Sequence, residues 1–111
     1  MRVTSSLWVS ALVRRYYTEG AIATVARRGA EEAGAIFITM DRLNGLADLY
    51  GPAPQASFEE SHPSDRLFQR LIESESFGSV SARLEKETRF DPDLWIVAIE
   101  DREGRAFFDA I

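Results

Sequence analysis

The chain contains no cysteine among its 111 residues. Disulfides, thiolate metal ligands and cysteine nucleophiles are therefore excluded, and the absence fits a reducing compartment. Histidine, the usual acid–base group near neutral pH, occurs once, at His62. Neither GxGxxG nor GxxxxGK(S/T), two common phosphate-binding patterns, is present. The motifs by which many enzymes are identified from sequence are thus missing.

Long hydrophobic runs are missing as well. The apolar stretch LWVSALV, residues 7–13, is interrupted by Ser10 and followed at once by Arg14 and Arg15. A membrane-spanning helix needs about 20 apolar residues. A signal peptide needs a longer apolar region and a small-residue cleavage site. We therefore expect no membrane segment and a cytoplasmic protein.

The chain does have enough apolar material for one core. Hydrophobic residues make up 45% of it, and the aromatic residues are seven Phe, three Tyr and two Trp. A chain of this length is ordinarily one domain with one core. We expect a single domain over residues 1–111.

The charges are distributed unevenly. The net charge of −5 argues against non-specific binding to nucleic acid. The first 30 residues nevertheless hold five of the 13 basic residues and one of the 18 acidic ones, so they carry +4 and the remainder −9. Such asymmetry can mark a surface for an anionic partner. The alternative, which we favour, is that the two parts pack together and their charges pair.

The first predicted helix lies near residues 6–18. It would begin after a cap at Ser5 or Ser6 and stop at Gly20. Its apolar face would comprise Trp8, Ala11, Leu12 and Tyr16. Alternating apolar residues over 7–13 also allow a strand, but the length of the segment favours a helix.

A three-stranded antiparallel meander is predicted over residues 21–50. Residues 21–28 form its first strand, and residues 35–41, AIFITMD, are rich in the β-branched and aromatic residues of strands. Asn44-Gly45 marks a tight hairpin turn before the third strand at 46–50.

The sequence of the second half of the chain indicates its strands less clearly. The prolines of LYGPAPQ, residues 49–55, end the third strand. Residues 66–74 fit a helix or a strand, and we favour a strand. Residues 94–100, LWIVAIE, are apolar on both faces, as a central strand would be. A hairpin loop at 101–104 would lead to 106–108, either a short last strand or a terminal helical turn.

A second helix near residues 78–89 completes the prediction. Apolar residues line one side of it, oppositely charged residues pair at i, i+4 on the other, and Asp91-Pro92 ends it. The sequence therefore predicts a two-layer α+β domain. Its mostly antiparallel sheet would contain the meander 21–50 and the strand 94–100, with the helices near 6–18 and 78–89 packed on it.

Four blocks of the sequence occur together in a known family. They are WVSALVRR, EEAGAIFI, LYGPAPQ and RFDPDLWIVAIEDREGR, and they span nearly the whole chain. With these blocks in this order, the chain resembles a family of short bacterial proteins catalogued as domain of unknown function 1491. The resemblance implies a single bacterial domain and carries no activity, cofactor or catalytic residue.

Two arginine pairs are candidates for ligand binding. Arg14-Arg15 lies near the end of the first helix, and Arg27-Arg28 ends the first strand. The guanidinium fork binds carboxylates and phosphates in a bidentate manner, so adjacent pairs would form an anion-binding patch. Pairing with the acidic remainder of the chain, or plain solvation, is the alternative.

The stretch LYGPAPQ could add a rigid rim with one aromatic and one amide side chain. The candidate ligand-binding residues are therefore Arg15, Arg28, Tyr50 and Gln55. For catalysis, His62 has carboxylates close by in the sequence at Glu59, Glu60 and Asp65. A single histidine in a polar loop makes a poor metal site, so we assign no catalytic residue, no metal ligand and no cofactor.

Three functions remain, in order of preference. The first is a small soluble binding or interaction module, with homodimerisation through an exposed sheet edge next to LYGPAPQ as one form of it. The second is an anion- or phosphate-ligand-binding protein that uses the arginine pairs. The third is a hydrolase-type enzyme that uses His62. Beyond a homo-oligomer the partner is unknown, and we expect neither membrane nor nucleic acid.

Overall fold

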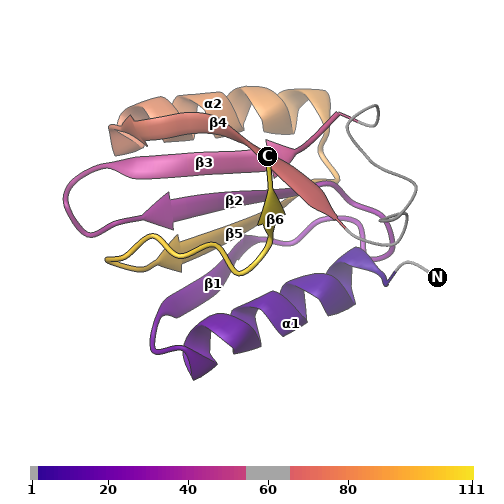
Figure 1. Cartoon of the computed structure of the whole chain (residues 1–111). Coiled ribbons are helices and arrows are strands. Elements are labelled where there is room, and N and C mark those ends of the chain that lie inside the picture. The colour runs from indigo at the N-terminus through magenta and orange to yellow at the C-terminus, as the bar shows by residue number, and fades with distance from the viewer. Residues whose placement is uncertain (1–2, 55–65) are drawn as a thin grey trace.

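The computed structural model describes residues 3–54 and 66–111. In chain order its elements are α1 (Ser5–Thr18), β1 (Ile22–Arg27), β2 (Ile36–Asp41), β3 (Ala47–Pro52), β4 (Leu67–Glu75), α2 (Phe77–Phe90), β5 (Trp95–Glu100) and β6 (Asp109–Ala110) (Figure 1). Within these residues the strands form one open, mostly antiparallel sheet in the order β1-β5-β2-β3-β4-β6. The predicted α+β class is confirmed.

The order of the strands differs from the predicted meander. The β2–β3 hairpin is antiparallel as expected, and Gly45 in its turn has a positive φ of 87°. The first pair of the meander is wrong, because β5 lies between β1 and β2, antiparallel to β1 and parallel to β2. A strand that is apolar on both faces is most stable in the centre of a sheet, and β5 takes that place.

The chain between β1 and β2 has to cross the segment that leads into β5. The backbone N–H of Ala30 donates to the carbonyl of Asp93, and the indole N–H of Trp95 donates to the carbonyl of Ala30, each at 2.8 Å. A Cβ atom on Gly29 or Gly34 would collide with the Asp93 carbonyl. The two glycines therefore permit a crossing that a hairpin would not need.

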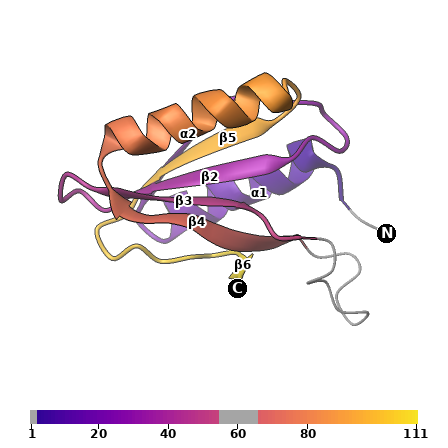
Figure 2. The same cartoon turned by 90° about the horizontal axis from the view of Figure 1, so that it is seen from above.

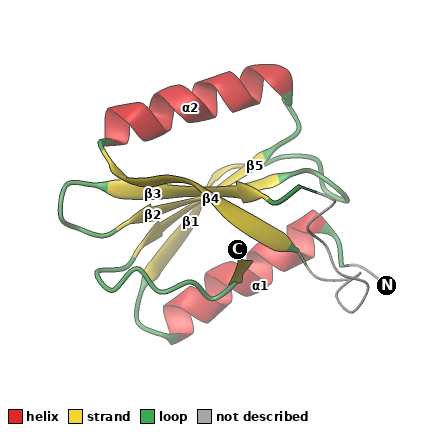
Figure 3. Ribbon diagram, turned by 45° about the horizontal axis from the view of Figure 1, so that its top comes forward, coloured by secondary structure: helices red, strands yellow, loops and turns green. Residues whose placement is uncertain are grey.

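The helices lie on opposite faces of the sheet, so the architecture has three layers and not the two predicted (Figures 2 and 3). The alternating side chains of β2 show the division. Ile36 and Ile38 join the core beneath α1, whereas Phe37 joins the core beneath α2. Each face of the central strands thus has its own hydrophobic core.

The first helix is confirmed, with a different cap and a different face. Thr4 is the cap, and its hydroxyl accepts the N–H of Leu7 at 3.2 Å. Ser5 is buried instead, where its hydroxyl donates to the carbonyl of Gly34 at 2.6 Å. The buried face consists of Ser5, Val9, Leu12 and Tyr16. The helix stops before Gly20, whose φ is 85°.

The ambiguous segment near 66–74 is a strand, as favoured. Its ladder with β3 is irregular at two places. The buried carboxylate of Asp48 accepts the N–H of Ser74 at 2.7 Å and lies 3.6 Å from Nη1 of Arg42. These contacts hold β4 where it bends toward α2. The second helix is also confirmed, with Ser76 as its cap and an Arg83–Glu87 ion pair of 2.8 Å.

The last strand is not where the sequence placed it. Residues 101–108 run across the face that α1 covers, and β6 pairs in parallel with the start of β4. The ring of Phe107 lies 4.8 Å from that of Tyr16, and the ring of Phe108 lies 5.0 Å from that of Tyr50. Consecutive residues of a strand point to opposite faces. The irregular backbone here lets both phenylalanines reach one core.

Replacing Phe108 with alanine should destabilise the protein. The change removes contacts with Tyr50 and Phe68 in the core, so we expect a loss of about 2 kcal/mol in the free energy of unfolding. Phe90→Ala is the matched control, because Phe90 is 80% exposed; its cost should stay within about 0.5 kcal/mol. Urea denaturation followed by circular dichroism measures both. Equal losses would show that the C-terminal segment does not close the core.

Candidate functional site

The predicted arginine patch is not assembled. Nε of Arg15 lies 3.3 Å from a carboxylate oxygen of Glu19, and its guanidinium carbon lies 4.4 Å from the centre of the Phe107 ring. The guanidinium of Arg28 lies over Trp95, 4.9 Å from the ring centre. The two arginines therefore contact different parts of the core.

The helix α1 separates these two places. Residues 29–34 follow Arg28 and reach the start of α1, where the N–H of Ser5 donates to the carbonyl of Glu32 at 3.0 Å. Arg15 lies about 15 Å further along the helix axis, at a rise of about 1.5 Å per residue. Arg15 and Arg28 thus lie toward opposite ends of α1.

Tyr50 belongs to the core and not to a rim. It is 3% exposed, its hydroxyl accepts N–H groups of Arg70 at 3.0 and 3.3 Å, and its ring contacts Phe108. The strand that contains it pairs with β2 on one side and β4 on the other. The exposed edge predicted next to LYGPAPQ is therefore wrong. Gln55 and the cluster around His62 lie outside the described residues.

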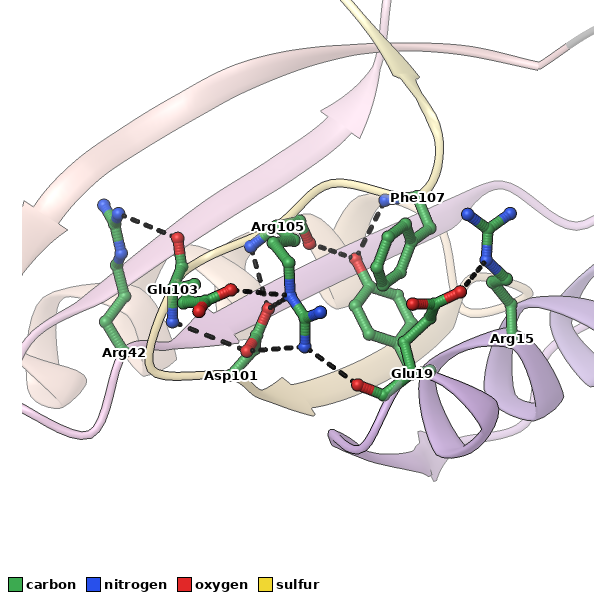
Figure 4. A network of polar contacts seen from close by, with 8 residues as sticks. Arg15, Glu19, Arg42, Asp101, Glu103, Arg105 and Phe107 are labelled. Atoms are coloured by element: carbon green, nitrogen blue, oxygen red, sulfur yellow. Dashed lines mark hydrogen bonds and ion pairs between the residues drawn. The ribbon is translucent and has the colours of Figure 1, made fainter.

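A dense polar network joins the segment after β5 to α1 (Figure 4). The Asp101 carboxylate, 6% exposed, accepts Nε of Arg105 at 2.9 Å and Nη2 at 3.2 Å. It also accepts the backbone N–H groups of Arg105 at 2.9 Å and Glu103 at 3.4 Å. The hydrogen bond from Arg105 is the main cause that lowers the pKa of Asp101.

The same network holds the end of the helix. Arg105 donates through Nη2 to the carbonyl of Glu19 at 3.1 Å, and its own carbonyl accepts the hydroxyl of Tyr16 at 2.6 Å. That hydroxyl accepts the N–H of Phe107 at 3.2 Å, and burial raises the pKa of Tyr16 to about 12. The polar groups satisfy one another within the chain. We interpret the network as a structural clamp that holds the segment after β5 against α1. It was not predicted from the sequence, although the four-residue spacing of Asp101 and Arg105 is a pattern that could have indicated an ion pair.

A cavity of about 520 Å³ lies at the end of the sheet near the start of α1. Thr4, Glu32, Pro52, Arg66 and Asp91 are among its lining residues. Its size is within the range of small-molecule sites. Its lining does not define a chemistry, because Thr4 caps α1 and Nη2 of Arg66 donates to the carbonyl of Val3. Across residues 3–54 and 66–111 no cluster of three or more potential metal ligands occurs.

Two edges of the sheet are open, and one is protected. Beyond Phe68, the outer side of β4 has no strand beside it in the described structure. This edge carries the charges of Arg70, Glu73 and Glu75, an Arg70–Glu73 ion pair of 3.0 Å, and a residue with positive φ, Ser74. Charges and irregular backbone are the features by which proteins prevent strands from adding to an edge.

The other edge, β1, has such protection only at its end, where its ladder with β5 shifts register between Val25 and Arg27. Its sequence is IATVAR, uncharged until Arg27, and its ladder with β5 is regular from Ile22 to Val25. None of the described residues hydrogen-bonds to its outer side. Half of the backbone N–H and C=O groups of an edge strand point outward. Residues 22–25 of β1 therefore offer an unprotected template for a further strand.

The sheet face beside this edge is uncovered. α2 packs on β3 and β4, and leaves the same face of β1 and β5 open. Ile22, 47% exposed, and Thr24 lie on this face of β1, opposite the exposed Glu100 and the half-buried Ala98 of β5. A groove of about 230 Å³ continues from there toward α2.

One flank of α1 extends the surface on the opposite face. Trp8 and Arg15 contact Phe68 and Phe107, toward the middle of the sheet. Helical geometry places the other flank toward the outer side of β1. That flank comprises Ser6, Ser10, Val13 and Tyr17. We call the outer edge of β1, its open residues Ile22 and Thr24, and this flank of α1 the β1 surface.

These features define a class: an α+β protein with a six-stranded mixed sheet, a helix on each face and one unprotected edge strand in the described residues. The chain belongs to the family described as protein of unknown function DUF1491, whose family model matches residues 3–109. The resemblance of the four sequence blocks is thereby confirmed.

Solved structures of bacterial relatives have the same fold. The crystal structure of a DUF1491 family protein from Caulobacter crescentus CB15 is 35% identical, with a TM-score of 0.80 over 100% of this chain and 99% of that one. The solution structure of protein Atu0922 from A. tumefaciens is 44% identical, with a TM-score of 0.79 over 90% of this chain and 86% of that one. No curated protein matches the chain. Within the described residues, neither helix is long and apolar enough to cross a membrane.

Acid should destabilise the protein through Asp101. Because Arg105 lowers the pKa of this carboxyl in the folded state, its contribution to stability is present above the pKa of the unfolded chain and is lost as the pH falls through the lowered value. Asp101→Asn should therefore reduce the free energy of unfolding near neutral pH. Below about pH 4 the difference in this free energy between the variant and the wild type should become smaller. Urea denaturation across this range measures the difference.

The control for this experiment is Asp93→Asn, which neutralises an exposed carboxylate. It should leave the acid dependence close to that of the wild type. If the difference in free energy of unfolding between Asp101→Asn and the wild type stayed constant down to pH about 2, the assigned role of the carboxylate would be contradicted.

Proposed function

We propose that this protein is an interaction module that binds an extended segment of a partner by strand addition at β1. The observation that carries the proposal is the contrast between the two open edges of the sheet. The β4 edge has charges, an ion pair and irregular backbone, whereas β1 is regular and uncharged from Ile22 to Val25. An edge strand whose outer side has neither charges nor irregular backbone is suited to pairing with a further strand.

Strand addition divides recognition between backbone and side chains. Main-chain hydrogen bonds supply affinity, and alternate side chains supply specificity. An added strand would extend the open face of Ile22 and Thr24 on one side. On the other side its residues would meet the flank of α1 that contains Val13 and the 57% exposed Tyr17. Both faces of the added strand would therefore gain apolar contacts.

We also propose that the protein acts in the cytoplasm. Support comes from the absence of cysteine among these 111 residues, which fits a reducing compartment.

A neutral extended peptide should bind at β1. The probe is a capped heptapeptide of alternating threonine and valine, which has strand propensity and no charge. We expect it to shift the amide resonances of residues 22–27 and to slow their hydrogen exchange, because pairing satisfies their outward backbone groups. Two-dimensional ¹⁵N–¹H spectra recorded during a titration measure both effects.

Two controls separate strand addition from other binding. The same peptide with N-methyl groups on alternate residues keeps its side chains but cannot form the ladder, and should not bind. The amides of residues 69–75, on the protected β4 edge, should not shift. Equal shifts at both edges, or binding of the N-methylated probe, would overturn the proposal.

A further inference from the structure

We infer that the segment recognised at the β1 surface is acidic at its N-terminal end and adds antiparallel to β1. This inference rests on the proposed function and names the chemistry of the partner. It starts from two arginines, Arg27 and Arg28, which lie at and just beyond the C-terminal end of β1 and form no ion pair within the described part of the chain.

Most of the other described arginines have a carboxylate partner. Arg15, Arg42, Arg70, Arg83 and Arg105 each form an ion pair. The pairing that we favoured for the basic N-terminal part and the acidic remainder is therefore not found at the β1 surface. Among the described residues, Arg15 forms its ion pair with Glu19, four residues away. Of the arginines in the first 30 residues, Arg27 and Arg28 keep an unpaired charge at the end of β1 within the described structure.

Arg27 and Arg28 are held in place without being neutralised. Nη1 of Arg27 donates to the carbonyls of Leu94 at 3.1 Å and of Arg28 at 3.3 Å. The guanidinium of Arg28 stacks over Trp95, which is 1% exposed. Stacking uses the face of the guanidinium and leaves N–H groups at its edge for a carboxylate. Side chains that are already ordered lose less conformational entropy when a ligand binds.

The position of these arginines sets the direction and the pattern of the partner. Both lie at the C-terminal end of β1, just beyond its uncharged stretch. Antiparallel pairing, the slightly more stable arrangement per residue, brings the N-terminal end of an added strand to them. Acidic residues there would be followed by β-branched residues opposite Ile22 and Thr24.

The charge of the whole chain favours this surface over others. The net charge is −5, so an acidic segment is repelled by most of the molecule and attracted where the arginines gather. A second copy of the chain would satisfy this pattern less well, because its own β1 is uncharged except for the arginines at its end. The geometry therefore points to a different, acidic chain as the occupant.

The test compares three capped peptides on the full chain at low ionic strength. They share a threonine–valine body and begin with two glutamates, two lysines or two threonines. We expect the glutamate peptide to bind at residues 22–28 about tenfold more tightly than the neutral one, since two partly exposed ion pairs contribute about that factor. The lysine peptide should bind most weakly. Salt at about 300 mM should remove most of the difference.

Charge reversal on the protein supplies the second arm. Arg28→Glu should abolish the preference for the glutamate peptide and favour the lysine peptide, because the sign at the end of β1 is exchanged. The control Arg89→Glu changes the net charge equally on α2, away from β1, and should keep the wild-type order. Circular dichroism confirms that both variants are folded. Thr24→Lys, which keeps Arg28 and adds a charge in the middle of the β1 edge, should weaken binding of the neutral peptide.

The outcomes separate the inference from the function on which it rests. If the neutral peptide binds at β1 and the glutamate peptide binds no better, strand addition stands and the acidic partner is wrong. If Arg89→Glu reverses the preference as well, only net charge matters and the inference is overturned. Sedimentation that shows a dimer dispersed by Thr24→Lys would assign β1 to a second copy and also overturn it. Binding of no peptide at β1 by a monomer contradicts both proposals.

Discussion

The insertion of β5 between β1 and β2 is the constraint on which the rest of the structure depends. Its side chains meet a core on each face, with Val97 and Ile99 buried beneath α1 and Ile96 partly buried on the side of α2. Such a strand is stable only with a neighbour on each edge and a layer on each face. The glycine-containing crossing between β1 and β2 and the placement of a helix on each side both follow from that requirement.

The same insertion leaves β1 at the edge of the sheet with β5 as its neighbour. In a simple meander, β1 would have paired with β2, whereas here it pairs with β5. The rest of the sheet is better covered than β1. On one face α2 packs on β3 and β4, and on the other face residues 101–108 pack beside α1, near β4. The clamp of Asp101 and Arg105 keeps that segment closed against α1. The open region that remains lies at β1, whose C-terminal end carries Arg27 and Arg28.

The candidate site could be predicted only in part. Arg28 was named from the sequence and lies just beyond the end of β1, because a basic pair at the end of a strand remains beside that strand however the sheet is assembled. Arg15 was expected beside it, but a long helix carries it about 15 Å away. Tyr50 was expected at a rim, but its strand became internal when β4 paired with it. Residues brought together by pairing between distant strands leave no local pattern.

The sequence by itself determined the local structure. Helix periodicity, the glycine stop, the Asn44-Gly45 turn and the doubly apolar stretch 94–100 predicted both helices, the β2–β3 hairpin and a central strand, since these depend on residues close in the chain. Only the tertiary structure decided which strands are neighbours, which faces are covered and which edge is open. Strand order depends on competition among all apolar faces for burial, and each strand presents the same backbone groups to every neighbour, so no single segment specifies its partner.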